Sequence, residues 1–226
     1  KLILGGSSLF ASWVLPGLMG EFSGNYPGVR VELVEESTQT LQNLLQRGRI
    51  DIMLDNCQLD PREFDRQTYR KERLFLAVPE KMASPEIIRS CAVTKERIEK
   101  DAWEKDEIPP VPLSCFADMP FIMLKPENDT RRRSMEILHR NHIEPRIILE
   151  LDQQLPSYHV ACTGHCIAFI SDTLIRAVPA RPDIVYFKLP EKESCREIRF
   201  YWKAGRYQTR AMEEFLRIAG NLALYR

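Results

Sequence analysis

Hydrophobic positions in the first 54 residues alternate between the short period of a strand and the longer period of a helix. The run Leu2-Ile3-Leu4 stops at Gly5-Gly6-Ser7-Ser8, where glycines permit a tight turn and hydroxyls can cap a helix. The next apolar residues are spaced as on one helical face, in which Pro16 is tolerated only in the first turn. Those residues are Leu15, Leu18, Met19, Phe22 and Tyr26. Pro27-Gly28 closes this predicted helix.

The same alternation continues to residue 54. Apolar and charged residues alternate over 29–34, as in a half-buried strand, and the chain turns again at Ser37-Thr38. A second helix, with its apolar stripe at Leu41, Leu44 and Leu45, ends at Gly48, and residues 50–54 form a third strand. Strands and helices that alternate with short connections predict a parallel sheet with helices packed against it.

A second series of the same kind is predicted from residue 121 onwards. Its strands are expected at 121–124, 147–151 and 167–170, with a helix before each of the last two and Gly164 at the end of the second helix. Short strands follow at 185–187 and 198–202. The last element, at 207–225, is a helix with one apolar face. That face consists of Met212, Phe215, Leu216, Ala219, Leu222 and Ala223.

Between the two series the pattern is less regular. A polar, proline-marked passage to Arg73 precedes an apolar strand at 74–78, which ends at Pro79. Residues 94–107, rich in Lys and Glu, predict a solvated helix, and Pro109-Pro110-Val111-Pro112 predicts a stiff linker. The fold class is therefore α/β, with two lobes joined by two passes of chain. We expect the first lobe to contain residues 1–79 and 203–226, and the second residues 80–202.

The turns after the strands are the expected place for a ligand. In open α/β sheets ligands bind beyond the carboxyl ends of the strands, so the turn residues of both lobes are expected to face a cleft between the lobes. In the first lobe they are Gly5 to Ser8, Glu36 to Thr38 and Asp55-Asn56, and in the second Pro126 to Thr130, Asp152-Gln153 and Ser171-Asp172.

Composition narrows the class of protein. The 226 residues are 44% hydrophobic, which is enough for a core, and Lys plus Arg and Asp plus Glu balance at 32 each. Net charge therefore gives no sign of a free-standing nucleic-acid binder. Six scattered cysteines suit reduced thiols in a cytoplasm, and no run is long enough to span a membrane. Because the chain begins at Lys1 and directly in a strand, we expect a fragment whose N-terminal portion has been removed.

The opening run resembles the effector-binding domain of LysR-type transcriptional regulators. The matching landmarks are Leu15-Pro16, Phe22, Tyr26-Pro27, and the spacing of Leu45, Gly48 and Asp51. Later runs, RLFLAVP at 73–79 and GHCIAFIS at 164–171, also look like landmarks of this family. Two departures stand out. Cys166 occupies a position where the family usually has a second glycine, and the passage at 85–116 is longer than the usual connection.

The resemblance implies a fold, a site and partners. The fold would be two Rossmann-like subdomains joined by two crossover strands, as in type 2 periplasmic binding proteins, with a small effector between them. Exposed N–H groups at helix starts, together with hydroxyls, favour a carboxylate-bearing metabolite as the effector. The expected effector-binding residues are Ser7, Ser8, Thr38, Asn128, Asp129, Thr130 and, as a weaker candidate, Gln153.

The implied protein is a cytoplasmic homodimer or homotetramer. It would bind DNA through an N-terminal winged helix-turn-helix that lies outside this chain, and it would need no cofactor, metal or membrane. Closure of the lobes on the effector would bias a dimer of dimers between two arrangements, which requires that the effector bind the two states with different affinities. The first helix and the strand at 29–34 would lie at the dimer interface.

Simpler interpretations stay open beside these. In one of them, the hydroxyls of Ser7, Ser8 and Thr38 cap helices and have no contact with a ligand. The run Arg131-Arg132-Arg133 is more in keeping with a solvated face or interlobe contacts than with a phosphate clamp, because consecutive helical residues point in different directions. Cys162 and Cys166 match no standard zinc spacing, so packing is favoured over redox or metal chemistry.

Two other classes of protein can use the same scaffold. One is a solute-binding component of a transporter. The other is an enzyme. The sequence argues against an enzyme because it contains no phosphate-binding loop, no nucleophile elbow and no paired acid and base.

Overall fold

The structure is a computed structural model that describes residues 1–101 and 108–224, except the side chains of residues 191, 223 and 224. It divides into two compact units. Unit 1 consists of Lys1–Lys71 and Glu197–Arg226, and unit 2 of Glu72–Arg196. The sequence placed the divisions at 79/80 and 202/203, a few residues further along the same two strands, β4 (Phe64–Pro79) and β10 (Cys195–Lys203). The chain thus passes between the units in extended strands.

Unit 1 contains the parallel sheet predicted from the opening of the sequence. The strand β1 (Leu2–Gly6) lies between β2 (Val31–Glu35) and β3 (Ile52–Asp55), parallel to both, with Leu4 beside Leu33 and Ile52. The sheet continues through β10, which is antiparallel to β3, to β4. The predicted β-α alternation over residues 2–54 is confirmed.

The first helical segment contains a π-helical turn, which the spacing alone does not reveal. The residues Phe10–Val14 form this turn (η1), and α1 (Leu15–Asn25) follows directly. The N–H of Leu15 donates to the carbonyl of Phe10, five residues back. Pro16 has no N–H to donate, so the regular series of α-helical backbone hydrogen bonds would be interrupted there. The π-helical turn lies just before this position. Pro16 does stand in the first turn of α1, as expected.

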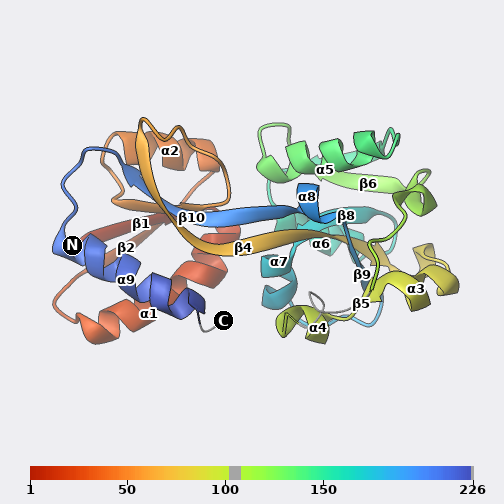
Figure 1. Cartoon of the computed structure of the whole chain (residues 1–226), viewed down its shortest axis with the longest axis horizontal. Helices are drawn as coiled ribbons and strands as arrows, with labels where there is room; N and C mark the ends of the chain where they lie inside the picture. The colour runs from red at the N-terminus through yellow and green to blue at the C-terminus, as the bar shows by residue number, and fades with distance from the viewer. Residues whose placement is uncertain (102–107, 225–226) are drawn as a thin grey trace. The chain divides into compact units, whose positions relative to one another are not determined.

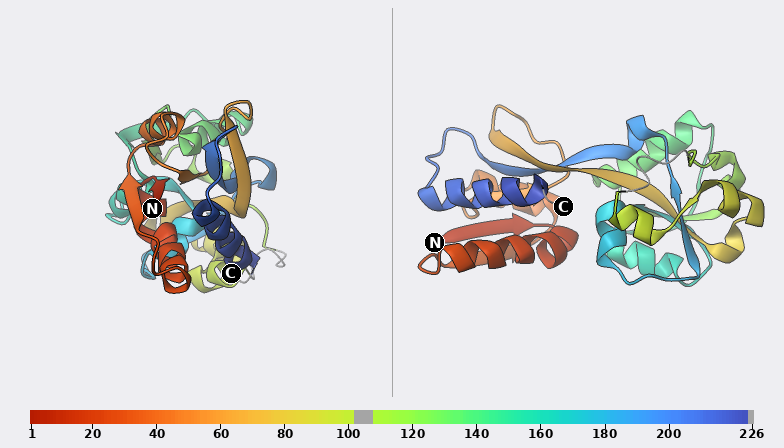
Figure 2. Two further views of the ribbon diagram at one scale, coloured as in Figure 1. Left: turned by 90° about the vertical axis from the view of Figure 1, so that its left-hand side faces the viewer. Right: turned by 60° about the horizontal axis from the view of Figure 1, so that its bottom comes forward.

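The core of unit 1 joins the first helix to the last. In Figures 1 and 2, α9 (Arg210–Leu224) runs beside α1. The rings of Phe22, Phe200 and Phe215 meet between them, with centroids 5.7 and 5.8 Å apart for the pairs that Phe215 forms. The predicted apolar face of α9 is confirmed for Met212, Phe215, Leu216 and Ala219, which are buried. Positions 223 and 225 of the predicted helix fall outside the described side chains.

The second helix ends as the sequence predicts. Leu41 and Leu45 of α2 (Thr38–Gln46) are fully buried. Gly48, two residues beyond α2, has φ +66°, a conformation that costs L-residues with a Cβ about 1–2 kcal/mol.

Replacement of Gly48 by alanine should therefore lower the free energy of unfolding by about 1–2 kcal/mol, measured by urea denaturation. Gly20 is the matched control, because it lies inside α1 and an added Cβ meets nothing within 4 Å. Gly20→Ala should raise stability by about 0.5–1 kcal/mol. Equal effects of the two substitutions would contradict the assigned backbone conformation.

Unit 2 has a mixed sheet in the order β7-β6-β8-β4-β9-β5. The strand β6 (Pro120–Leu124) is parallel to β7 (Arg146–Leu151) and β8 (Ile167–Ser171), and β4 is antiparallel to β8 and β9 (Ile184–Lys188). Four helices belong to the second predicted series and its continuation: α5 (Asp129–Arg140), α6 (Gln154–Ala161), α7 (Asp172–Ala177) and α8 (Glu191–Ser194). Gly164, with φ +85°, follows α6 as predicted.

Two connecting passages differ from their predictions. The strand β4 begins at Phe64, ten residues before the predicted start at residue 74, so the polar residues 64–73 belong to the same strand. The passage from 85 to 116 is part of unit 2: α3 (Pro85–Cys91) leads into β5 (Ala92–Val93), which pairs with β9, and α4 (Lys95–Glu99) follows. Ile98 is fully buried, so α4 is not a solvated helix. Residues 102–107 of the predicted helix lie outside the described part.

The proline-rich stretch is not a linker either. Val111 is buried in the core of unit 2, and its N–H donates to the carbonyl of Lys188 at 3.0 Å. Leu113 and Phe116 lie in the same core, on a 3-10 turn (Leu113–Phe116). The prolines stiffen this stretch, but it packs in the core of unit 2 because burial of its apolar residues stabilises that unit.

Candidate functional site

The carboxyl ends of β1, β2 and β3 meet at one edge of unit 1. Gly6 lies beside Glu35 of β2 and Leu54 of β3, so the residues that follow these strands gather there. Gly6 lets β1 pack closely against the first helical segment, because an added Cβ would lie 2.9 Å from the side chain of Leu15 and 3.3 Å from the backbone nitrogen of Ala11. The predicted site residues of the first lobe belong to this corner.

Ser7 and Ser8 stand at the start of the first helical segment. The carbonyl of Ser7 accepts from the N–H of Ala11 at 2.8 Å, which is the first bond of that segment. Both side chains are half-buried, and neither hydroxyl has a hydrogen-bond partner in the described part of the chain. The N–H groups of a first helical turn lack intrahelical acceptors. This corner can therefore offer hydroxyls and N–H groups to a ligand.

Thr38 has a different role from the one its position suggested. The N-cap of α2 is Ser37, whose hydroxyl oxygen accepts from the N–H of Thr40 at 3.2 Å. Thr38 donates its hydroxyl to Asp55 Oδ2 at 2.9 Å. The interpretation of Thr38 as a cap is thus wrong, because the chain turns one residue earlier. Its oxygen keeps lone pairs for a further donor.

Asp55 is a buried carboxylate at the same corner. Besides Thr38, it accepts from the N–H of Cys57 at 2.9 Å, and its side chain is almost fully buried. Burial raises the pKa of this carboxyl, against the N–H groups of Cys57 and Asn56 and the hydroxyl of Thr38, which lower it. The sequence placed Asp55 in a cleft-facing turn but did not select it as a site residue.

Relative to the parent protein, the Asp55→Asn variant should become more stable as the pH rises. The folded-state pKa of Asp55 lies above the ordinary 3.8, so the native carboxylate loses stability as the pH rises from 3.8 through that folded value. Urea denaturation from about pH 3 to about pH 7 should show the advantage of the variant growing over this window.

Asp60 provides a control of opposite sign. The neighbouring Arg62 lowers the pKa of Asp60 to about 2. Its contribution is therefore present above 3.8 and is lost as the pH falls toward 2, so Asp60→Asn should lose stability relative to the parent as the pH rises. A pH-independent difference for Asp55→Asn would contradict its raised pKa.

Unit 2 has a corresponding corner at the carboxyl ends of its parallel strands. There β6 lies between β7 and β8, and the N–H of Lys125 donates to the carbonyl of Leu151 at 2.9 Å. Asn128 is the N-cap of α5, and its side-chain oxygen accepts from the N–H of Thr130 at 2.8 Å. Asn128 therefore caps the start of α5.

Asp129 is engaged within unit 2. Its Oδ1 accepts from Arg132 at 2.6 Å, and its Oδ2 accepts from Arg133 at 2.8 Å and from Arg196 at 3.2 Å. Burial raises the pKa of Asp129, but the charges of Arg196 and Arg133 outweigh this effect and hold the pKa below its usual value. Asp129 therefore anchors the start of α5.

Thr130 is buried at the centre of a polar network. Its hydroxyl oxygen accepts from Arg196 Nη1 at 2.9 Å and from Gln154 Nε2 at 3.2 Å. Gln154 Oε1 in turn accepts from the N–H of Ser171 at 2.8 Å. Arg196 Nε donates to Glu72 Oε2 at 2.6 Å, and both of these side chains are almost fully buried. The network joins α5, α6, β4, β8 and β10.

Sequence reasoning missed Gln154 and Arg196. It favoured Gln153, which is the N-cap residue of α6 but whose half-buried side chain forms no capping bond. A period-2 pattern does contain the missing signal. Arg196 shares a strand face with the buried Ile198 and Phe200, and Glu72 shares one with Leu74. Opposite charges on two such apolar faces predict a buried pair.

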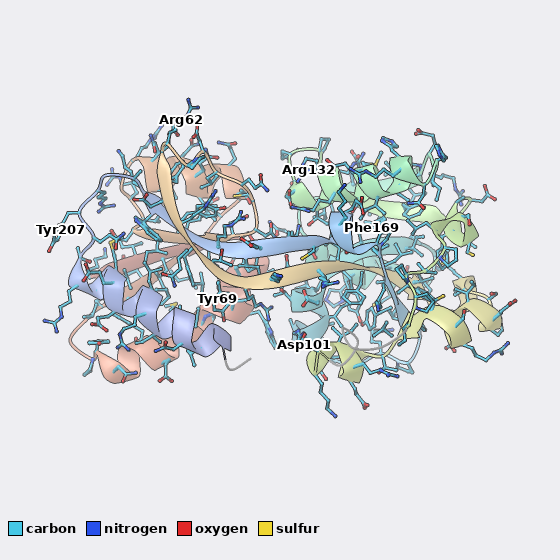
Figure 3. The ribbon with its side chains drawn as sticks, in the orientation of Figure 1. Arg62, Tyr69, Asp101, Arg132, Phe169 and Tyr207 are labelled. Atoms are coloured by element: carbon cyan, nitrogen blue, oxygen red, sulfur yellow. The ribbon has the colours of Figure 1, made fainter. Side chains whose placement is uncertain are left out.

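The three consecutive arginines point in different directions, as expected. Arg131 donates to the carbonyl of Leu124 and to Glu150, and Arg133 to Asp129 and to the carbonyls of Glu193 and Cys195. Arg132 is half-exposed and projects from the surface of α5 in Figure 3. All three are bound to acidic or carbonyl groups of unit 2, which favours a structural role over a phosphate clamp.

Among residues 1–101 and 108–224, no group of three His, Cys, Asp or Glu side chains could hold a metal ion. All six cysteines lie within the described residues and are thiols that form no disulfide. Cys166 is buried, and burial raises the pKa of its thiol. None of the described helices is both long and apolar enough to cross a membrane.

Comparisons with known proteins give one consistent result. The chain is 21% identical over 222 residues to the uncharacterized HTH-type transcriptional regulator YcgK of Bacillus subtilis (strain 168), covering 97% of this chain and 66% of that protein. The chain therefore spans slightly less than two thirds of the length of that relative.

Solved structures of similar fold are regulatory domains. The CcmR regulatory domain of Synechocystis PCC6803, in complex with 2-PG, has a TM-score of 0.78 and 18% identity, covering 98% of this chain and 96% of that one. The effector binding domain of QuiR, in complex with shikimate, has a TM-score of 0.74 and 13% identity, covering 99% and 97%. Residues 1–223 match the family model described as the LysR substrate binding domain.

Proposed function

Because this chain belongs to the LysR substrate binding domain family, we propose that it is the effector-sensing part of a LysR-type transcriptional regulator. The remaining third of such a protein would include the N-terminal winged helix-turn-helix that binds DNA. The matched relative is named as an HTH-type regulator, which favours this function over transport of a solute. We further propose a cytoplasmic homodimer or homotetramer in which α1 and β2 lie at the interface between protomers.

The proposed effector is a small metabolite that contains a carboxylate. One observation supports this proposal above the others: in each unit, the carboxyl ends of parallel strands lead into helix starts that present hydroxyls. In unit 1 these are Ser7 and Ser8, and in unit 2 the hydroxyl is Thr130. Hydroxyls and N–H groups at a helix start are suited to an anionic group. Shikimate, which QuiR binds, is such a carboxylate.

The role of Thr38 and Asp129 in this proposal is indirect. Thr38 is hydrogen-bonded to Asp55, and Asp129 to three arginines, so each would hold its corner in shape. Gln153 and Asn128 border the corner of unit 2, Asn128 as the cap of α5. The effector would regulate by binding one arrangement of the protein more tightly than another, since only differential affinity shifts such an equilibrium.

A thermal-shift screen tests the function. The chain is heated with a panel of small organic acids, including shikimate and benzoate, and with the primary amide of each acid. A ligand present at 100 times its Kd stabilises a protein by about 2.7 kcal/mol, which for a chain of this size raises the Tm by several degrees. We expect such a rise for at least one acid and none for its amide. If no acid in the panel shifts the Tm, the proposed ligand class is wrong.

The serines provide the matched test of the site. Ser7→Ala with Ser8→Ala should abolish the shift given by the acid and leave the Tm of the ligand-free protein within a few degrees. A large fall in the ligand-free Tm with an unchanged response to the acid would instead assign both serines to the stability of the helix start.

A further inference from the structure

The hydroxyl of Thr130 is held by donors alone. A threonine hydroxyl has one hydrogen to donate and two lone pairs that accept. Arg196 Nη1 and Gln154 Nε2 both point to this oxygen, at 2.9 and 3.2 Å. A guanidinium has no acceptor, and the amide of Gln154 is oriented with its nitrogen toward Thr130. Both lone pairs of Thr130 are therefore in use.

The orientation of the Gln154 amide follows from its other bond. Gln154 Oε1 accepts from the N–H of Ser171 at 2.8 Å, inside the buried part of unit 2. A backbone N–H can only donate, so a reversed amide would place two donors against each other. The nitrogen must then face Thr130. Gln154 is itself buried, so water does not compete for the hydrogen bonds of its amide.

The hydrogen of Thr130 is consequently left to donate elsewhere. No residue in the described part of the chain accepts from it. Arg196 Nη2 is also buried and without a hydrogen-bond partner among the described residues. Thr130 is 2% exposed, so its acceptor would be a molecule that enters this corner, either a buried water or a ligand. Two buried donors, the Thr130 hydroxyl at the first turn of α5 and Arg196 Nη2 on β10, therefore have no acceptor among the described residues.

We propose that Arg196 and Gln154 are positioning residues that present the Thr130 hydroxyl to the effector only as a hydrogen-bond donor. This inference rests on the proposed function and specifies its chemistry. The effector group that meets Thr130 is an acceptor, such as a carboxylate or another oxyanion, and an ammonium or amide N–H group is rejected there. Specificity comes from the penalty of placing a donor against a donor in a buried site.

Neutron diffraction from crystals of the deuterated chain tests the orientation without any ligand. The deuterium on Thr130 Oγ1 is expected to point away from both Arg196 Nη1 and Gln154 Nε2. A map in which Gln154 presents its oxygen to Thr130, with the deuterium directed at that oxygen, would overturn the proposal.

Titration calorimetry tests the consequence for binding. The probes are the acid with the largest thermal shift and the amine in which an aminomethyl group replaces the carboxylate. Thr130→Val removes the donor, and Gln154→Glu replaces a donor by an acceptor that attracts the Thr130 hydrogen. Each should raise the Kd for the acid about 10- to 100-fold, because a hydrogen bond to a charged group is lost.

Two variants separate this effect from general damage. Thr130→Ser keeps the hydroxyl, and Ser134→Ala removes another buried hydroxyl of α5, one that donates to the carbonyl of Thr130. Both should change the Kd less than about threefold.

The outcomes distinguish the two proposals. Binding of the acid that is unchanged in Thr130→Val and Gln154→Glu would overturn this inference and leave the proposed function standing. Tighter binding of the amine than of the acid, or no binding of any acid, would overturn the ligand class and this inference together.

Discussion

Replacement of Arg196 by methionine should lower the free energy of unfolding by about 3–5 kcal/mol. The guanidinium of Arg196 is buried and bonded to Glu72, Asp129 and Thr130. Methionine preserves much of the volume but removes the positive charge that Arg196 places against the fully buried Glu72 carboxylate. A single buried charge costs much more than the loss of the pair as a whole. Urea denaturation at neutral pH measures the effect.

A second variant isolates the charge. Glu72→Leu combined with Arg196→Met removes both ions, so the double variant should be more stable than Arg196→Met alone. The control is Arg62→Met, because Arg62 forms an ion pair with Asp60 at 2.6 Å on an exposed loop, and the loss of an exposed pair should cost less than about 1 kcal/mol. A loss below about 1 kcal/mol for Arg196→Met would show that the pair is not essential to unit 2.

Phe215→Ala should cost about 3–5 kcal/mol of stability in unit 1. The ring of Phe215 is fully buried and meets Phe22 of α1 and Phe200 of β10 edge to face. Its removal leaves a cavity among side chains from three elements, which cannot collapse without moving a helix or a strand. Chemical denaturation followed by tryptophan fluorescence measures the loss.

Tyr207 is the matched control for Phe215. It precedes α9, is 83% exposed and projects into solvent in Figure 3. Tyr207→Ala should stay within about 0.5 kcal/mol of the parent. Equal losses in the two variants would mean that α9 is not anchored through its apolar face.

The elements with regular periods could be predicted from the sequence, and those with mixed patterns could not. Apart from the π-helical turn at Phe10–Val14, the strands and helices up to residue 55 have a regular strand or helix period. The beginning of β4 does not, because charged residues alternate with few apolar ones and the strand is specified by its neighbours in the sheet. At Val111 the prolines dominated the interpretation, while the buried apolar side chain determined the structure.

The candidate site shows the same division. Local rules place Asn128 as a cap and Ser7 at a helix start, since both depend on nearby residues. The contact of Arg196 with Thr130 joins residues 66 positions apart, and that of Gln154 with Thr130 joins residues 24 apart. No local pattern specifies such contacts. The choice between Gln153 and Gln154 depends on which side chain faces the start of α5.

The division of the chain into units has a consequence for its biosynthesis. Unit 2 is one continuous segment, Glu72–Arg196, whereas unit 1 needs residues from both ends of the chain. On a ribosome, unit 2 can complete its core as soon as its segment has emerged, but β1 and α1 must wait for β10 and α9 to cover Leu2, Leu4 and Phe22. Until then these apolar surfaces are open to chaperones and to aggregation. The nascent chain is therefore most vulnerable in β1 and α1, which are made before the rest of the core that covers them.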